Sequence, residues 1–181
     1  MPAGFSSSAS VCSTTHEAVL TAIVYKLRTD IPELGNESCC FMSDAPSPGI
    51  EIHENLFCTV APADDTFDDR SPMGAAERGI VEFAIVQVTV WSRLMLDRLE
   101  HSNRALTDSA RGLLKVKHRI LQSLAGQQIY TDAPLNLVPL LIEPLRPVRA
   151  LHPTSRRADD DLRSISLIFR AAFSWDLTSA S

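Results

Sequence analysis

The feature that most constrains the fold is the clean alternation of apolar residues with mostly polar ones near the C-terminus. From Ile165 to Leu177 every second residue is apolar, whereas the intervening positions include Ser166, Arg170 and Ser174. Successive side chains of a β-strand point to opposite faces, so this pattern predicts an antiparallel strand that buries one face. A helix is the natural cover for that face. The chain is therefore expected to contain an antiparallel sheet with helices packed on it.

Two segments carry helical periodicity. The sequence Thr14-x-x-Glu17 is a capping box, and the apolar residues that follow it at helical spacing predict a helix near residues 15–30, which Pro32 ends. A second capping signal at Asp97 precedes leucines spaced by sevens. This spacing predicts a helix of about 28 residues that ends before Gly126.

Three further segments predict strands. Ile50–Val60 has an imperfect strand pattern, and Ile80–Trp91 is rich in β-branched residues on both sides, which predicts a central strand with both faces covered. Between them, residues 61–79 predict a long acidic loop. Prolines interrupt the apolar segment Leu135–Leu145, which predicts an edge strand or an extended arm. The order α-β-β-α-β-β predicts an α+β fold, in which two helices pack on an antiparallel four-stranded sheet with long loops.

A chain of 181 residues can bury one hydrophobic core. We expect a single domain over residues 14–177, a flexible leader over 1–13 and a short tail over 178–181. No apolar run is long enough to span a bilayer, and the leader lacks the basic residues of a secretory signal, so synthesis in the cytoplasm and no membrane partner are expected. The four cysteines at positions 12, 39, 40 and 58 form no C-x-x-C pair, which favours free, buried thiols.

Charge is distributed unevenly along the chain. Residues 1–90 carry 4 basic and 13 acidic side chains, a net −9, whereas residues 91–181 carry 13 basic and 9 acidic ones, a net +4. If the two halves present different faces, the acidic face of one copy fits the basic face of the next. This complementarity favours head-to-tail association of identical chains. A solvated surface with accidental bias is the alternative.

No motif for chemistry stands out. Glycine-rich phosphate-binding loops and nucleophile signatures are absent from the sequence, and the spacing of the aspartates in 61–79 does not match a calcium loop. His16-Glu17 begins like a zinc-binding helix, but Leu20 stands where the second histidine is needed. We therefore expect no catalytic residues, no cofactor and no metal. A nucleic-acid-binding adaptor that uses Arg111, Lys115 and Arg119 is an alternative of another class.

The segment from Val81 to Gly126 resembles the middle of the tail terminator, or tail completion, proteins of long-tailed bacteriophages and phage-like particles. In that family a strand ending in V-x-V-x-x-W or a similar pattern leads into a helix of the form x-A-L-x-x-x-A-x-x-L-L. The closing strand ISLIFRAAFSWDL and the opening helix THEAVLTAIVYKL also look like the family's last strand and first helix. The residues that carry the central resemblance are Val86, Val88, Val90, Trp91, Ala105, Leu106, Ala110, Leu113 and Leu114.

The resemblance implies a structural virion protein and not an enzyme. Such a protein forms a ring, usually a hexamer, that caps the tail tube, stops its elongation and joins the tail to the neck and head. Its partners would be further copies of itself, the tail tube protein, and a neck or head-completion protein, while DNA passes through the lumen without sequence-specific binding. A head-to-tail connector or neck protein at an adjacent station is the alternative. We expect the protein–protein contacts to lie in two charged loops, at Asp64, Asp65, Asp68, Asp69, Arg70, Arg156, Arg157, Asp159, Asp160 and Asp161.

Overall fold

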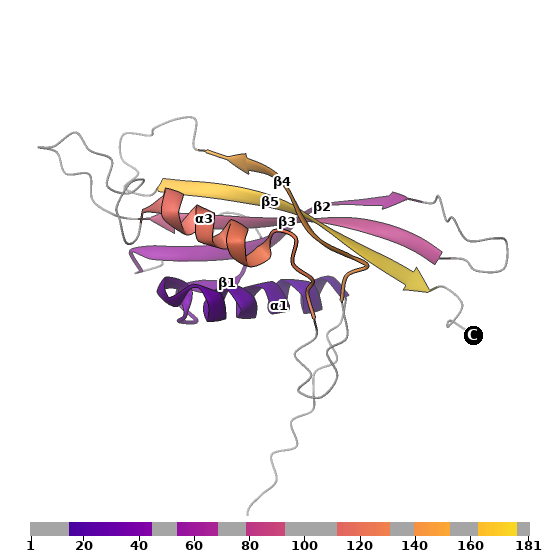
Figure 1. Ribbon diagram of the computed structural model, residues 1–181, viewed down its shortest axis with the longest axis horizontal. Helices are drawn as coiled ribbons and strands as arrows, with labels where there is room; N and C mark the ends of the chain where they lie inside the picture. The colour runs from indigo at the N-terminus through magenta and orange to yellow at the C-terminus, as the bar shows by residue number, and fades with distance from the viewer. Residues whose placement is uncertain are drawn as a thin grey trace, which may run out of the picture.

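The structure is a computed structural model that describes residues 15–44, 54–68, 79–92, 112–130, 140–152 and 163–176. Over these residues one sheet is accompanied by two α-helices and a short 3-10 helix (Figure 1). The elements, in chain order, are α1 (Thr15–Asp30), η1 (Pro32–Leu34), β1 (Cys40–Met42), β2 (Leu56–Asp68), β3 (Gly79–Ser92), α3 (Leu113–Leu124), β4 (Glu143–Leu151) and β5 (Arg163–Asp176).

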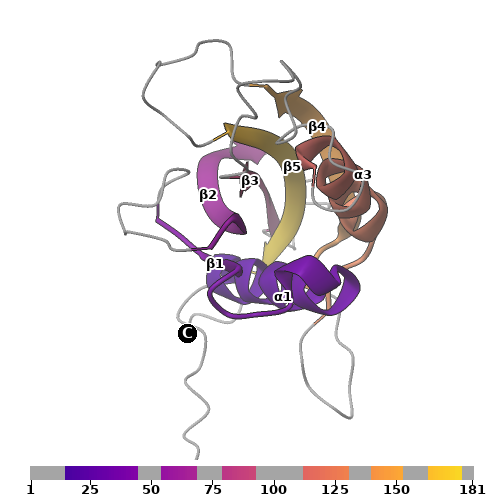
Figure 2. The same ribbon diagram turned by 90° about the vertical axis from the view of Figure 1, so that its left-hand side faces the viewer.

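The strands lie in the order β1-β2-β3-β5-β4. β1 runs parallel to β2, and every other neighbouring pair is antiparallel. The pairing of β3 with β5 is unbroken from Gly79↔Asp176 to Ser92↔Arg163, so these two long strands form the rigid centre of the sheet. β4 and the short β1 form its two borders. The curved sheet and its two helices are seen along the strands in Figure 2.

The hydrophobic core lies between the helices and one face of the sheet, which we call the helix-covered face. α1 buries Val19, Ile23 and Leu27, and α3 buries Val116 and Ile120, all at helical spacing. The sheet contributes alternate residues of its three long strands. These are Leu56, Cys58, Val60, Ala84, Val86, Val88, Val90, Ile165, Leu167, Phe169, Ala171 and Phe173.

Both helices end where the sequence changes. α1 stops at Asp30 because Pro32 lacks the N–H that a further helical turn requires, and Pro32 instead starts η1. α3 stops at Leu124, and Gly126 takes a φ of 72°, which glycine adopts without strain. The segment after Gly126 then lies beside the start of β4, where the Leu145 N–H donates to the Gln127 carbonyl at 2.9 Å.

Much of the predicted architecture is confirmed. The helix predicted near 15–30 is α1, and the alternating C-terminal segment is β5, with its apolar residues from Ile165 to Phe173 buried. The segment Ile80–Trp91 is β3, the middle strand of the five. β4 is an edge strand, as expected for this proline-rich region, although it starts at Glu143 instead of Leu135.

Two expectations need correction. The sheet is mixed and five-stranded, not antiparallel and four-stranded, because β1 adds a parallel strand beside β2. The predicted loop over 61–79 begins with strand, since β2 continues to Asp68 against β3. The described helices cover one face of β3, and on its other face Thr89 is buried and Gln87 is half-buried, so the expectation that both faces are covered stays a prediction. The long helix predicted from Asp97 is described only from Leu113 onward, and the domain limits stay a prediction.

Candidate assembly surfaces

Three of the ten predicted contact residues fall within the described structure. Asp64, Asp65 and Asp68 lie on the second half of β2, where a strand replaces the predicted loop. The other predicted contacts lie outside the described residues, so whether the two charged loops lie near each other stays a prediction. They are Asp69, Arg70, Arg156, Arg157, Asp159, Asp160 and Asp161.

The second half of β2 forms what we call the acidic edge, residues 61–68. β1 pairs only with residues 58–60 of β2, and Ser43 N–H adds a hydrogen bond of 2.9 Å to the Val60 carbonyl. Beyond Val60, no described strand pairs with β2 on that side, whereas its other side is paired with β3 as far as Asp68. Pro62, Ala63 and Asp64 are exposed, and the register shifts between Pro62 and Asp65. Proline and a bulge are both typical of strand edges.

The opposite border of the sheet is the outer side of β4, and we call residues 146–151 the basic edge. The β4 start is partly covered, because Gly126 N–H donates to the Leu145 carbonyl at 2.8 Å. From Arg146 onward no described strand lies outside β4. Arg146 and Arg149 are exposed here, and Val148 has 55% of its surface exposed. Arg146 forms an ion pair of 3.0 Å with Glu143, and Arg149 keeps the net charge of this edge positive.

The strand register places the two edges at the same height along the sheet. Pro62 pairs with Val86 of β3, Val86 with Phe169 of β5, and Phe169 with Pro147 of β4. Arg146 is paired with Arg170, and Arg170 is paired with Ile85. Ile85 is one position from Ala84, which is the partner of Asp65. Asp64 and Arg146 therefore lie at opposite ends of nearly the same row across the sheet.

The face of the sheet that no described helix covers, which we call the open face, carries side chains that stack on or hydrogen-bond to one another. Phe57 and Trp91 stack with ring centroids 5.9 Å apart, and the Trp91 indole donates to the Thr59 hydroxyl at 3.3 Å. Gln87 donates to the Ser166 hydroxyl at 3.0 Å.

Next to Arg146, the Arg170 guanidinium lies 4.9 Å from the centroid of the Phe83 ring. Arg170 and Arg146 are register partners with like charges, and the cation–π contact gives the Arg170 guanidinium a favourable partner in Phe83. Three arginines, at positions 146, 149 and 170, thus gather near the β4 border of the sheet.

The contact between α1 and α3 is held by polar side chains at its rim. Ser123 of α3 donates a hydrogen bond of 2.6 Å to Asp30, and this bond, with Lys26 at 2.9 Å, holds the pKa of Asp30 below its ordinary value of 3.8. Burial opposes the ionisation of Glu33, but its backbone hydrogen bond and the Arg119 guanidinium outweigh burial and hold its pKa below 4.5. Both carboxylates favour the folded state when ionised.

This network bears on the nucleic-acid alternative. Arg119 bonds to both carboxylate oxygens of Glu33, so its guanidinium already has an anionic partner within the chain. Arg111 lies outside the described residues. Of the three residues that the adaptor hypothesis requires, one is therefore engaged in holding η1 against α3.

The same network predicts a loss of stability in acid. Because the folded-state pKa values of Asp30 and Glu33 lie below their ordinary values, their stabilisation is complete above about pH 5 and is lost as the pH falls through 4 toward the folded-state values. Urea unfolding between pH 7 and pH 3 is expected to show a smaller acid-induced decrease for a D30N/E33Q variant. Asp44→Asn, at an exposed residue outside the network, should follow the wild-type curve. An unchanged curve for D30N/E33Q would contradict this assignment.

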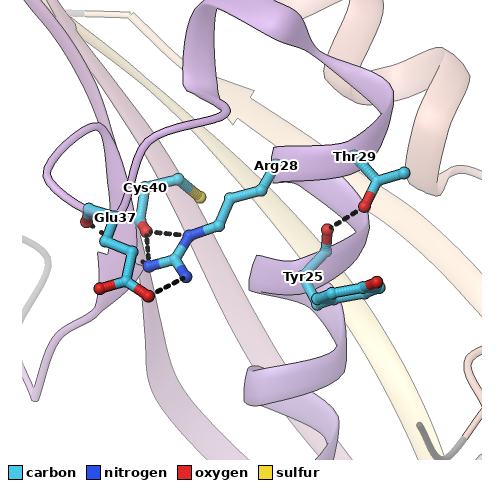
Figure 3. Close-up of polar contacts among 5 residues, drawn as sticks. All are labelled: Tyr25, Arg28, Thr29, Glu37 and Cys40. Carbon is cyan, nitrogen blue, oxygen red and sulfur yellow. Dashed lines mark hydrogen bonds and ion pairs between the residues drawn. The ribbon is translucent and has the colours of Figure 1, made fainter.

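A polar hydrogen-bonded cluster ties the short β1 to α1 (Figure 3). The Arg28 guanidinium donates to the Cys40 carbonyl through Nε at 2.8 Å and through Nη2 at 2.6 Å, and it lies 3.8 Å from the Glu37 carboxylate. On the same helix the Thr29 hydroxyl donates to the Tyr25 carbonyl at 2.9 Å. Arg28 thus positions the border strand that no sequence pattern predicted.

The three described cysteines are free and buried, as expected. Cys40 and Cys58 are register partners in β1 and β2, and a hydrogen bond between the two thiols, together with burial, raises the pKa of Cys58. Burial also raises the pKa of Cys39. Thiols in this state are poor nucleophiles, because the thiolate is the reactive form.

A polar pocket of about 250 Å³ lies beside Cys39, between η1 and the start of β2. It is lined by Pro32, Glu33, Asn36, Cys39, Glu54, Asn55 and Leu56. Its carboxylates are already engaged, Glu33 by Arg119 and Glu54 by the Ser38 hydroxyl at 2.9 Å.

Nowhere in the described part of the chain do three or more histidine, cysteine, aspartate or glutamate side chains gather in a way that could hold a metal ion. No helix within it combines the length and the apolar character needed to cross a membrane.

Sequence reasoning missed the basic edge and the connected open face. Pro144 and Pro147 favour an edge strand or an extended arm, whereas the signal for the basic edge is the spacing of Arg146 and Arg149, three positions apart among apolar residues. The open face could have been anticipated from the polar residues Gln87 and Thr89 within β3, which fall on the same side of the strand as Trp91.

Comparisons with known proteins complete the description. No protein-family model matches the chain, and no curated protein matches it. Among solved structures, the fold is similar to that of a chain from a structure described as "Virion of native gene transfer agent (GTA) particle". The sequence identity is 19%, the TM-score is 0.49, and the alignment covers 90% of this chain and 99% of that chain.

Proposed function

We propose that this chain is a structural protein of a phage-like virion, which forms a hexameric ring at the head–tail junction. The ring caps the tail tube, stops its elongation and joins the tail to the neck. Its partners are further copies of the chain, the tail tube protein and a neck or head-completion protein. In this role the protein contributes packed and charged surfaces and catalyses no reaction.

The observation that carries the proposal is how the segments that resemble the tail terminator family pack together. Val86, Val88 and Val90 of β3 lie in one core with Leu113 of α3 and with the apolar residues of β5. α1, which corresponds to the family's opening helix, packs on the same core. Segments far apart in the sequence thus form a single helix-covered sheet, as the resemblance requires.

Charge supports association of the head-to-tail kind. The acidic half of the chain contributes β2, which lies toward one border of the sheet, and the basic half contributes β4 at the other border. Surfaces that differ at two opposite borders join copies by a heterologous contact, and such contacts produce a closed ring when the rotation between copies closes. Six copies carry a net charge of about −30, which favours passage of DNA through a lumen without adhesion.

Electron microscopy of the full chain and of particles from the producing cells tests the proposal. We expect annular particles of the purified protein, and we expect particle-associated copies at the head-proximal end of the tail when antibody labelling is used. Deletion of the gene should yield tail tubes of unregulated length that lack heads. Labelling at the neck with tubes of normal length would instead favour the connector station. Purified particles that lack the chain would overturn the proposal.

A further inference from the structure

We propose that the acidic edge of β2 in one copy contacts the basic edge of β4 in the next copy, and that this edge-to-edge contact joins the subunits. The inference rests on the proposed ring and deepens it, because it names the two borders that meet. The occupant of each edge is a second copy of the same chain.

The topology makes the contact possible. Among the described strands, none pairs with the outer side of β2 beyond Val60 or with the outer side of β4 beyond Arg146. These two unpaired sides lie on opposite borders of one sheet. β2 and β4 run in opposite directions, since each step from β2 through β3 and β5 to β4 is antiparallel. A neighbour placed beside the sheet in the same orientation therefore brings its β4 antiparallel to β2.

The charges match at the heights set by the register. Asp64 and Arg146 occupy nearly the same row, and Ala61 lies on the row of Arg149, because Ala61, Gln87, Ile168 and Arg149 are successive partners. A copy added with little displacement along the strands thus places Asp64 opposite Arg146, while Arg149 lies opposite Ala61. Like charges would face each other if two acidic edges or two basic edges met, so the contact selects the head-to-tail arrangement.

The side chains available at these edges fit an interface. Arg146 is 61% exposed, and Val148 places exposed apolar surface between the two arginines. Pro147 has no N–H, which prevents an uninterrupted ladder of backbone hydrogen bonds between copies. The contact is therefore made mainly by side chains. Exposed ion pairs are individually weak and screened by salt, so assembly through these edges is expected to weaken as salt is added.

Complementary charge reversal tests the contact. The basic-edge variant R146D/R149D and the acidic-edge variant D64R/D65R should each associate at least about tenfold more weakly than the wild type in sedimentation velocity experiments at low salt. When the two variants are mixed in equal amounts, each supplies the edge that the other has lost. Mixing should restore association, and the restored particles should contain even numbers of subunits.

Controls separate this contact from folding and from the ring itself. H118D/Q122D adds acidic side chains at two exposed positions of α3, which belongs to neither edge, and should associate like the wild type. Because only folded variants can complement each other, recovery on mixing also shows that both fold. If the wild type associates and the edge variants associate equally well, or if mixing restores nothing, the edge contact is overturned while the ring proposal stands.

Two further outcomes would also decide against the contact. A wild-type chain that stays monomeric at every concentration and salt would overturn both the edge contact and self-assembly into a ring. A basic-edge variant that keeps its self-association but loses binding to double-stranded DNA would assign the arginines to nucleic acid instead.

Discussion

Replacing Phe169 by alanine is expected to lower the free energy of unfolding by about 3–5 kcal/mol. Phe169 lies in the middle of β5, is fully buried on the helix-covered face, and is paired with Val86 on one side and Pro147 on the other. Truncation to alanine removes the ring from the core and leaves a cavity that a sheet paired on both sides cannot close. The change is measured by urea unfolding monitored by circular dichroism at low protein concentration.

Val148→Ala is the matched control for this prediction. Val148 lies on the neighbouring strand β4, but it is 55% exposed and outside the core, so its truncation should change the free energy of unfolding by no more than about 0.5 kcal/mol. Comparable losses for the two variants would show that the core is not organised around β5. The urea dependence of the free energy should be unchanged in both variants, because neither alters the surface exposed on unfolding.

The long strands could be predicted because burial on one face imposes a period of two. Ile165, Leu167 and Phe169 alternate with Ser164, Ser166 and Ile168, and only one of these outward residues breaks the polar pattern. Ile168 lies on the open face and is nevertheless 7% exposed. Where burial is one-sided and continuous, hydrophobic periodicity is enough to place an element.

The elements at the sheet borders depend on pairing with neighbouring strands and not on hydrophobic periodicity. β1 has three residues, too few for any period, and it exists because β2 and the Arg28 side chain offer hydrogen-bond partners for its backbone. The second half of β2 is acidic and contains Pro62, both of which are typical of loops, yet β3 pairs with it on both sides of the bulge at residues 63 and 64. At a border, pairing by a neighbour outweighs local preference.

The candidate assembly surfaces were likewise predictable only in part from the sequence. The charge asymmetry between the two halves of the chain could be read directly from sequence, and three of the predicted aspartates do lie on an edge of the sheet. That Arg146 and Asp64 share a row depends on the order β2-β3-β5-β4 and on three register shifts, one between β2 and β3 and two between β4 and β5. Neither the strand order nor the register shifts are encoded in a local sequence pattern. The basic edge of β4 could therefore be identified only from the strand pairing in the structure.

Replacing Arg28 by methionine is expected to cost about 1.5–3 kcal/mol in the free energy of unfolding. The guanidinium donates two hydrogen bonds to the Cys40 carbonyl, and methionine keeps the aliphatic stem but removes every donor. The carbonyl then loses a charged partner in a part-buried position. Because Cys40 begins β1, the loss should also loosen the border strand and not only lower global stability.

Local and global effects can be separated by hydrogen exchange. The Cys58 N–H donates to the Cys39 carbonyl at 2.7 Å, so its exchange rate reports whether the segment leading into β1 stays docked on β2. Arg28→Met should accelerate exchange at Cys58 more than at amides of the β3–β5 pair, and Arg28→Lys should lie between it and the wild type. The Glu37 side chain is 93% exposed, and Glu37→Gln removes only its 3.8 Å ion pair with Arg28. This variant should change neither the free energy of unfolding nor the exchange rate at Cys58 appreciably. If Glu37→Gln destabilised the chain as much as Arg28→Met, the exposed ion pair and not the bonds to the Cys40 carbonyl would hold β1 in place.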